Sequence, residues 1–281
     1  MTLPFRAIIS DLDGTLLNAN HRIGDFTIET LRKLSQRGVD IFLATGRNYP
    51  DVKHIISKVG VSDAMLVTSN GARGNNLSGE LLYQNHIPEE IAFKIMSETP
   101  FDPKRVFINS YQGDGWFINI EIEQLRKYHQ DSGFMYQVVD FQQHHGKKTE
   151  KVFFIGKTPE DLLPVEQFVR HHYGDLLQIT YSTSQCLEMM NKGVCKANTL
   201  ADLVKLRGYT LKDCIAFGDG MNDIEMLSQA GKGCLMGNAD PRLKQALPNN
   251  EQIGENKDEA VAQYLRQLFQ LDKICNSRAW N

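Results

Sequence analysis

The stretch "IISDLDGTLL", residues 8–17, places two carboxylates directly after a short apolar run. That run, residues 5–10, is typical of a buried strand. Asp11 and Asp13 then stand at the end of the strand, where two ionised carboxylates repel one another and lose hydration. Such a pair needs a cation or a proton to offset its charge. We therefore searched the rest of the chain for the residues that would complete a site around that partner.

The composition is that of a globular protein without a strong net charge. The chain has 281 residues, enough for one large domain or two ordinary ones, and 41% of them are hydrophobic. Lys and Arg number 31 against 34 Asp and Glu, which gives a formal net charge of −3. This balance offers no electrostatic reason to expect a nucleic-acid partner. No run of 18 apolar residues occurs, so we expect no membrane partner either.

The N-terminus and the cysteines predict a cytoplasmic location. The first residues, MTLPFRAIISDLDG, lack the apolar segment and cleavage site of a signal peptide. The cysteines are odd in number and show no CxxC spacing, so we expect reduced thiols rather than disulfides or a zinc site. They are Cys186, Cys195, Cys214, Cys234 and Cys275.

Strand and helix patterns alternate through the first part of the chain. After the strand at 5–10, the apolar spacing predicts, in order, a helix at 27–38, a strand at 40–47, a helix at 50–60 and a strand at 64–72. Gly38 stands where helices commonly end, and Pro50 stands in the first turn of the second helix. This alternation predicts an α/β fold class with a doubly wound, parallel, Rossmann-like core sheet.

The pattern changes between residues 84 and 186. Aromatic strand patterns occur there at 105–110, 116–120, 151–156 and 177–182. Helix patterns separate them at 88–98, 121–131 and 159–172. We interpret this region as an α+β cap domain inserted into the core.

The alternating pattern returns after the insertion. Its predicted elements are a helix at 196–208, a strand at 213–220, a helix at 222–231, a strand at 233–237 and a helix near 257–270. The predicted domains are therefore 1–83 for the first half of the core, 84–186 for the cap and 187–281 for the second half of the core.

Four predicted core strands end in polar residues. These are Asp11 with Asp13, Thr45, Ser69 with Asn70, and Asp219 with Asp223. Because ligands of open parallel sheets gather outside the carboxyl ends of the strands, we expect one acidic pocket, with Lys196 beside it at a helix start. Few carboxylates together with a phosphate suit Mg²⁺, which binds oxygen ligands and keeps several waters.

This pocket predicts phosphoryl-transfer chemistry. Asp11 is placed to be the nucleophile, because carboxylates form aspartyl-phosphate intermediates. Asp13 would protonate the leaving group and later activate water; alternation along an extended segment would turn both carboxylates to the same phosphate. Thr45 and Gly46 offer a hydroxyl and a backbone N–H to phosphate oxygens, and Lys196 adds positive charge.

Four segments of the chain resemble, in order, the four motifs of the haloacid-dehalogenase-like hydrolase superfamily. They are DLDGT at 11–15, LATGR at 43–47, Lys196 in NKGVCKANTL, and GDGMNDIEML at 218–227. The insertion between the second and third motifs resembles the cap of the Cof-type phosphatases. Within that subfamily, VTSNGAR and KDCIAFGDGMNDIEMLSQAGKGCLMG are most similar to bacterial pyridoxal phosphate phosphatase. Ala197 replaces a glycine that is frequent in the family, which leaves the role of the lysine intact.

The resemblance, which covers nearly the whole chain, implies a magnesium-dependent phosphomonoesterase. Its substrates would be small phosphorylated metabolites, namely pyridoxal 5'-phosphate, sugar phosphates or both. It implies Asp11 as nucleophile, Asp13 as acid and base, and Mg²⁺ held by the Asp11 side chain, the Asp13 main-chain carbonyl and Asp219. The residues implied to meet the phosphate are Leu12 through its N–H, Thr45, Gly46, Lys196 and Asn222.

Other sites with similar local sequence do not fit this chain. An EF-hand loop requires an acid or Asn at Thr15, a Gly at Leu16 and a Glu at Arg22, and none is present. GDGMND lacks the third glycine of a dinucleotide-binding loop, and no GxxxxGK[ST] segment occurs.

For each of three supporting residues, the sequence allows two roles. Asp223 either orients a metal ligand or is an acid that favours a helix start. Arg47 either contacts substrate or braces the aspartates, and we favour bracing. Asn70 either lines the pocket or belongs to a tight turn before a hairpin.

Two other functions share parts of this pattern. A phosphomutase would use the same aspartate and metal but return the phosphoryl group to its product. A phospho-receiver module also has an acidic pocket, a threonine and a lysine. It needs neither a second carboxylate at a spacing of two nor an inserted cap, so the chain favours an enzyme.

Overall fold

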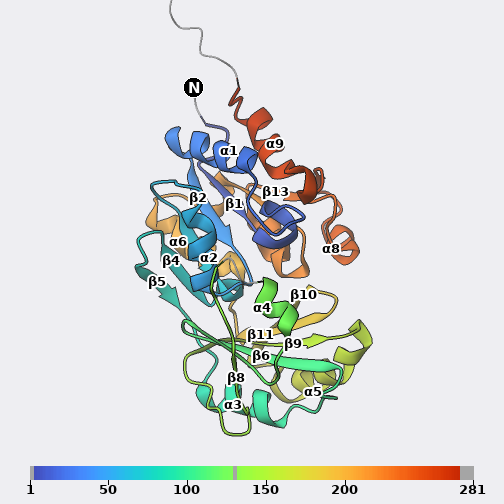
Figure 1. The fold of residues 1–281 in the computed structure, drawn as a ribbon. Coiled ribbons are helices and arrows are strands. Elements are labelled where there is room, and N and C mark those ends of the chain that lie inside the picture. The colour runs from blue at the N-terminus through green and yellow to red at the C-terminus, as the bar shows by residue number, and fades with distance from the viewer. Residues whose placement is uncertain (1–2, 129–131, 273–281) are drawn as a thin grey trace, which may run out of the picture.

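The computed structural model describes residues 3–128 and 132–272, and these residues form two sheets with separate sets of helices (Figure 1). The helix expected at 121–131 is described only as α4 (Glu123–Tyr128), since 129–131 lie outside the described residues. Cys275 lies outside them too, and the four described cysteines are free thiols. Within the described ranges, no helix is both long and apolar enough to cross a membrane.

The larger sheet is the core, and its central part has the predicted parallel arrangement. In spatial order its strands are β14 (Glu251–Gln252), β13 (Lys232–Leu235), β12 (Cys214–Gly218), β1 (Ala7–Ser10), β2 (Asp40–Ala44), β3 (Met65–Thr68), β4 (Arg73–Asn76) and β5 (Leu81–Gln84). All neighbours from β14 to β3 pair in parallel, whereas β4 and β5 add an antiparallel edge. The Rossmann-like core fold is thereby confirmed.

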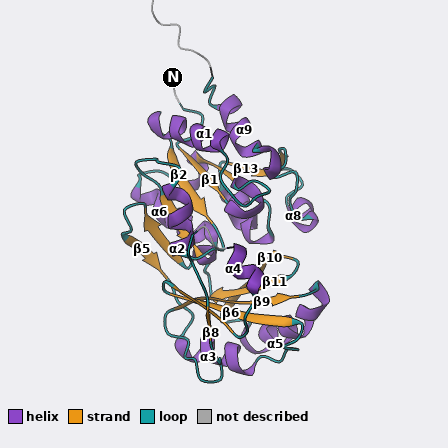
Figure 2. Cartoon of the chain, viewed as in Figure 1, coloured by secondary structure: helices purple, strands orange, loops and turns teal. Residues whose placement is uncertain are grey.

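Helices cover both faces of this sheet (Figure 2). They are α1 (Asp25–Gln36), α2 (Tyr49–Ser57), α6 (Lys196–Leu206), α7 (Ile224–Gln229), α8 (Pro241–Ala246) and α9 (Ala260–Leu268). The strand order runs one way from β1 to β3 and the other way from β12 to β13. Because crossover connections are right-handed, this reversal places α1 and α2 on one face and α7 on the other.

The core elements form because their sequences bury apolar side chains from both sides. All four residues of β1 and all five of β12 are buried, as expected for strands covered on both faces. In α1 the buried positions Thr27, Thr30, Leu31 and Leu34 follow helical spacing. The result is a rigid sheet whose strand ends are fixed in register.

The smaller sheet is the predicted α+β cap. In spatial order its strands are β10 (Leu177–Thr183), β11 (Cys186–Asn191), β9 (Thr149–Gly156), β6 (Val106–Gln112), β7 (Gly115–Ile118) and β8 (Gln137–Val138). Side chains such as Val152 and Phe154 pack with α3 (Glu89–Glu98) and α5 (Leu163–Tyr173). Figure 1 shows these two helices on the side of the sheet that faces away from the core. The opposite face, which carries Lys151 and Phe153, is turned toward the core.

The strand pairing places the domain boundaries later than the predicted residues 84 and 187. β5 ends at Gln84 within the core sheet, and β11 pairs with β9 and β10 in the cap sheet. We therefore propose 85–191 as the cap in place of 84–186. The two proposals differ in the placement of residues 187–191, whose apolar run LEMM does not by itself indicate which sheet it joins.

Candidate active site

The ends of β1 and β12 lie side by side, and both continue into acidic residues. Ser10 pairs with Phe217, and the backbone N–H of Asp11 donates a hydrogen bond to the carbonyl of Phe217 over 3.0 Å. Asp219 follows β12 directly. This pair of strands is where the strand order reverses, which is the usual ligand position of an open α/β sheet.

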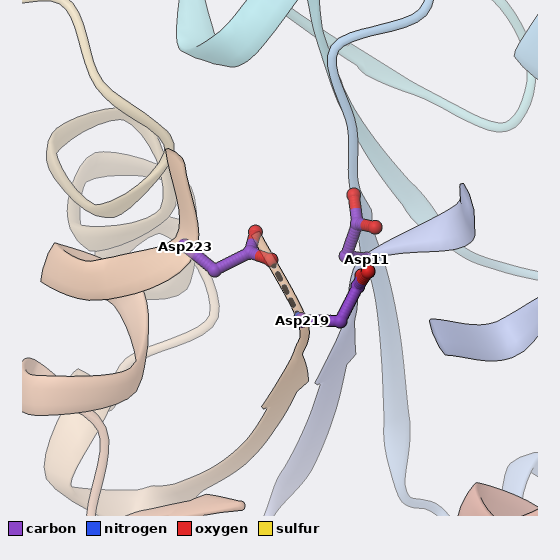
Figure 3. Close-up of side chains that lie close together, drawn as sticks. All are labelled: Asp11, Asp219 and Asp223. Carbon is purple, nitrogen blue, oxygen red and sulfur yellow. Dashed lines mark hydrogen bonds between the residues drawn. The ribbon is translucent and has the colours of Figure 1, made fainter. Parts of the chain in front are cut away.

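Three carboxyl groups converge at this point (Figure 3). Asp11, Asp219 and Asp223 each contribute one oxygen to a group whose members all lie within 4.8 Å of one another. Asp11 comes from the end of β1, Asp219 from the end of β12, and Asp223 from the short turn η5 (Met221–Asp223) that follows. The predicted convergence of Asp11 and Asp219 is thus present, and Asp223 joins them.

Lys196 connects two of these carboxylates. Its Nζ lies 2.7 Å from Asp11 Oδ1 and 2.6 Å from Asp223 Oδ1, and its side chain is fully buried. The residue begins α6, so the helix start places it against the strand ends. One ammonium group therefore shares its single positive charge between two of the three acids.

Asp223 also fixes the backbone that carries Asp219. Its Oδ2 accepts hydrogen bonds from the backbone N–H groups of Asp219 and Gly220, each over 3.0 Å (Figure 3). The side chain makes no capping bond to α7, although the residue precedes that helix. Of its two interpretations, the geometry therefore favours the one in which Asp223 orients a neighbouring acid.

Thr15 and Gly14 position Asp219 from the opposite side. Thr15 Oγ1 donates to Asp219 Oδ1 over 2.8 Å. Gly14 has a positive φ of 74°, and a Cβ there would lie 2.2 Å from Asp219 Oδ2. The glycine of DLDGT is thus required both by the backbone and by the close approach of this carboxylate.

Asp11 and Asp219 lie in an environment that opposes negative charge. Burial raises the pKa of Asp11 well above its ordinary value, although Lys196 acts in the opposite direction. Burial, reinforced by Asp223, raises the pKa of Asp219 to about 7. Burial disfavours the charged form of Lys196 as well, but Asp11 and Asp223 outweigh it and raise the pKa of the ammonium group. A further cation beside Asp11 and Asp219 would relieve the remaining repulsion.

The donor set fits a hard divalent cation. It consists of carboxylate oxygens on two rigid strand ends, with Asp219 oriented by Thr15 and by the backbone contact of Asp223. Oxygen ligands of this kind suit Mg²⁺, whereas zinc sites use Cys and His, which are absent from this cluster.

Asp13 belongs to a separate contact with Arg47. Arg47 Nε and Nη2 each donate to one Asp13 oxygen over 2.6 Å, and Nη1 donates to Asp51 over 2.6 Å. This geometry matches the bracing interpretation of Arg47. His21 Nδ1 lies 3.7 Å from Asp13 Oδ1, and the Asp13 side chain is 39% exposed. Asp13 is therefore the more accessible of the two opening carboxylates.

The expected extended alternation from Asp11 to Asp13 is wrong. The backbone is extended at Asp11 and again at Asp13, but Leu12–Leu16 closes into a wide turn that Gly14 permits with its positive φ. The two carboxylates meet different partners: Asp11 bonds Lys196, and Asp13 bonds Arg47. The spacing of two is retained, but a turn rather than a strand sets the two directions.

The residues expected to meet phosphate surround these carboxylates on three loops. Leu12 is buried at the start of the wide turn, and Thr45 follows β2. Thr45 Oγ1 accepts a hydrogen bond from the Arg47 N–H over 3.1 Å. Asn222 Nδ2 donates to Asn70 Oδ1 over 3.0 Å. Asn70 links the loops of Thr45 and Asn222, because its own N–H also donates to the Thr45 carbonyl over 3.0 Å.

Asn70 lies in the tight turn that one of its two interpretations predicted. It has a positive φ of 57° in the turn η2 (Ser69–Gly71), which leads into the antiparallel strands β4 and β5. Its side chain also reaches the cap, because Asn70 Nδ2 donates to Glu188 Oε2 over 2.6 Å.

Two cap residues at the site were missed by the sequence reading. Lys151 on β9 and Glu188 on β11 form a buried ion pair that touches the core loops. The available signal was a charged residue on each of two strands that are otherwise largely apolar, KVFFIG and CLEMMN. Charged residues are rarely buried without a partner, so both positions merited attention.

Comparison with known proteins agrees with this geometry. The sequence model of a haloacid dehalogenase-like hydrolase family matches residues 8–265. The chain belongs to this family. A Haemophilus influenzae protein that carries a phosphatase name is 59% identical over 272 residues, covering 97% of this chain and 100% of the relative. The resemblance to Cof-type phosphatases is confirmed, and the chain is a haloacid-dehalogenase-type phosphatase.

Two further relatives extend the comparison. The HMP-PP phosphatase of Escherichia fergusonii is 36% identical over 255 residues, covering 91% of this chain and 92% of the relative. A solved haloacid-dehalogenase subclass IIB sugar phosphatase is 25% identical with a TM-score of 0.78, covering 95% of this chain and 99% of that structure. Both likenesses span core and cap together.

Proposed function

We propose that this phosphatase is a magnesium-dependent phosphomonoesterase that works through an aspartyl-phosphate on Asp11. The observation that carries the proposal is the placement of Asp11 at the end of β1, in contact with Lys196 and in the acidic cluster with Asp219. An ionised carboxylate in such a place is a suitable nucleophile for phosphorus. The family membership supports the reaction class.

The charged groups would divide the work of phosphoryl transfer. Asp11 attacks phosphorus and carries the phosphoryl group until water releases it. Lys196 Nζ, held by Asp11 and Asp223, supplies positive charge where the phosphoryl oxygens gather. When bound by the Asp11 and Asp219 side chains and the Asp13 carbonyl, magnesium supplies charge neutralisation for the same oxygens.

Asp13 would handle the proton. Its exposed carboxyl lies on the open side of the site, where a leaving group can approach. Arg47 holds the ionised carboxyl with two hydrogen bonds, so Asp13 must give up part of this bidentate contact when it takes up the proton that it donates. Asp13 then protonates the leaving alcohol and later takes a proton from the water that attacks the phosphorylated Asp11.

The space beside Asp13 supports a small metabolite as substrate. A cavity of about 950 Å³ lies next to the Asp13–Arg47 contact, lined by core residues that include His21 and Arg47 and by Gln124 of the cap. Its volume matches the ligand sites of small molecules. We propose phosphorylated metabolites of this size, with pyridoxal 5'-phosphate and sugar phosphates as first candidates. The name of one relative, a sugar phosphatase, agrees with the second candidate, and the name of another, HMP-PP phosphatase, adds HMP-PP as a third.

A phosphate-release assay tests the function. Purified protein with Mg²⁺ is given a panel of pyridoxal 5'-phosphate, sugar phosphates and HMP-PP, and inorganic phosphate is measured. We expect release from at least one class, and complete loss in Asp11→Asn, because an amide cannot attack phosphorus. Release of phosphate to water separates hydrolysis from the phosphomutase alternative. A variant that keeps a tenth of the activity would show that Asp11 is not the nucleophile.

A further inference from the structure

Lys151 and Glu188 form an ion pair buried between the cap and the core. Lys151 Nζ lies 2.6 Å from Glu188 Oε1, and each side chain is 3% exposed. The two residues come from neighbouring strands, β9 and β11, on the face of the cap sheet turned to the core. The rings of Tyr111 and Phe153 lie beside the ammonium group, at 5.0 Å and 4.5 Å. The pair therefore has no access to solvent that could screen it.

Both members of the pair also bond the core. Lys151 Nζ donates to the Gly46 carbonyl over 2.7 Å, directly after Thr45. Glu188 Oε2 accepts from Asn70 Nδ2 over 2.6 Å. Asn70 Oδ1 in turn accepts from Asn222 Nδ2 over 3.0 Å. One continuous chain of hydrogen bonds thus runs from Gly46 through the cap pair to Asn222, and both of its ends are segments expected to bind phosphate.

The donor and acceptor roles along this chain are forced by Glu188. An ionised carboxylate only accepts, so the NH₂ group of Asn70 must face Glu188. The side-chain oxygen of Asn70 then faces Asn222, which must donate to it from its own NH₂ group. The carboxylate on the cap therefore decides the orientation of two amides in the core. The second hydrogen of Asn222 Nδ2 remains as a donor for phosphate.

Lys151 has a similar effect on the loop after β2. Its ammonium group holds the Gly46 carbonyl, so the N–H of the same peptide unit, that of Arg47, points away from the cap. That N–H donates to Thr45 Oγ1 over 3.1 Å. Because the hydroxyl oxygen is already accepting, its own hydrogen is available to donate to a phosphate oxygen.

The close approach of the cap depends on the glycine of LATGR. A Cβ at Gly46 would lie 3.1 Å from Asn70 Oδ1, 3.4 Å from Lys151 Nζ and 3.6 Å from Glu188 Oε1. A Cβ at this position would crowd Asn70 Oδ1 and would touch Lys151 Nζ and Glu188 Oε1 at ordinary contact distances. The space therefore fits a contact made for the cap pair.

We propose that Lys151 and Glu188 are positioning residues, which act through Gly46 and Asn70 to turn Thr45 and Asn222 as hydrogen-bond donors toward phosphate. This inference rests on the proposed function, because it assumes that phosphate binds between these loops. Burying an ion pair carries a desolvation cost that a packed apolar pair would avoid. The positioning role explains why the pair is buried despite this cost. The Thr45 and Asn222 donors are correctly oriented only when the cap contacts the core.

A donor–acceptor swap tests the proposal. In Glu188→Gln, the oxygen of the glutamine amide accepts from Lys151. Its NH₂ group then faces the NH₂ group of Asn70, so the chain of hydrogen bonds is broken. In the double variant Glu188→Gln/Asn70→Asp, the glutamine donates to the new carboxylate, which still accepts from Asn222. Asp tolerates the positive φ at position 70. Lys94→Met, at the exposed Lys94–Glu90 pair of the cap helix α3, is the matched control for Lys151→Met.

The readouts are kcat and KM for p-nitrophenyl phosphate, the inhibition constant of inorganic phosphate, and the rise in melting temperature that phosphate causes. We expect Glu188→Gln and Lys151→Met to lower kcat/KM and to weaken phosphate inhibition by at least about tenfold. The swap variant should recover most of the loss of Glu188→Gln, and Lys94→Met should match the wild type. A swap no better than the single variant, or phosphate binding unchanged in Glu188→Gln, would overturn the proposal.

The phosphate-induced rise in melting temperature separates this proposal from the proposed function. A wild-type protein that is inactive on every substrate but stabilised by phosphate, less so in Glu188→Gln, would refute the function and support the positioning role. An active wild type whose phosphate stabilisation is the same in all variants would refute the positioning role alone. A wild type that phosphate does not stabilise would refute both.

Discussion

Lys196 Nζ lies 2.7 Å from Asp11 Oδ1, and both groups are buried at the end of β1. The lysine comes from α6, which follows the cap in the chain, whereas the aspartate lies near the N-terminus. Their contact therefore joins the two halves of the core around the inserted cap. It also leaves an acidic cluster in which one ammonium group serves Asp11 and Asp223 together.

The first prediction concerns the loss of this ammonium group. Lys196→Met leaves Asp11 and Asp223 buried without their cation, which should lower the free energy of unfolding by about 3–5 kcal/mol. Magnesium at the same carboxylates would replace part of the missing charge. We therefore expect the deficit in melting temperature to be larger in EDTA than in magnesium, with activity lost in both. Thermal unfolding followed by circular dichroism measures the difference.

Lys205→Met is the control for that experiment. Lys205 lies on the same helix in an exposed pair with Asp202 at 3.3 Å, so its loss should change stability by less than about 1 kcal/mol. Equal melting temperatures of Lys196→Met and the wild type in EDTA would contradict the neutralising role of the lysine.

The second prediction concerns the metal. Chelation with EDTA should abolish phosphate release, and added Mg²⁺ should restore it. Ca²⁺ should inhibit, because it takes more ligands at longer distances than the Asp11 and Asp219 cluster offers, and this would displace the nucleophile. A metal titration of the hydrolysis rate measures both effects. Undiminished turnover in EDTA would exclude a metal role for Asp219.

The third prediction concerns Glu150, a buried acid at the contact between cap and core. Burial raises its pKa to about 7, while the hydrogen bond from Ser69 and the nearby charge of Arg73 act in the opposite direction. The folded protein therefore keeps a proton that the unfolded chain, with an ordinary pKa of 4.5, has already lost. The stability from this group is complete below about pH 4.5 and is lost as the pH rises through 7.

Glu150→Gln should remove this pH dependence, because glutamine cannot ionise yet can still accept the Ser69 hydroxyl. Relative to the wild type, the variant should gain about 3 kcal/mol between pH 4.5 and pH 8, an order of magnitude set by the size of the shift. Urea unfolding at several pH values measures the gain. Glu90→Gln, on an exposed part of α3, is the control, and parallel curves for Glu150→Gln and wild type would refute the assignment.

Sequence patterns predicted the core better than the cap. Parallel strands buried on both faces, such as β1 and β12, leave continuous apolar runs that end in polar residues, and these runs marked the sheet and the positions of Asp11 and Asp219. The strand β11 has the same kind of apolar run but pairs within the cap sheet, and its sequence does not indicate this. Which sheet a strand joins depends on long-range pairing, which local spacing does not encode.

The residues of the site show the same limit of local sequence patterns. Single motifs indicated Asp13 and Arg47 separately, but their contact depends on how the segments after β1 and β2 pack against one another. Lys151 and Glu188 were not predicted, because in the sequence each resembles an ordinary charged surface residue. Only the contact between cap and core shows that they bond the core loops. Residues that meet only in the tertiary structure cannot be recognised from local sequence patterns.

The fourth prediction concerns Asp13 and its proposed role as acid and base. The carboxyl is accessible and oriented by Arg47, so it can reach the leaving group while Asp11 attacks phosphorus. An alkyl alcohol is a poor leaving group and needs a proton, whereas p-nitrophenolate leaves without one. Asp13→Asn should therefore slow phosphoryl transfer from an alkyl phosphomonoester by about a hundredfold or more, and from p-nitrophenyl phosphate far less.

Single-turnover measurements decide this prediction, because they separate phosphoryl transfer from hydrolysis of the phosphorylated enzyme. With p-nitrophenyl phosphate, Asp13→Asn should give a rapid burst of nitrophenolate followed by slow phosphate release, since water is no longer activated. With the alkyl ester the first step itself should be slow. Equal slowing of the first step for both substrates would limit Asp13 to a structural or metal-holding role. The proton donor would then have to come from the cap.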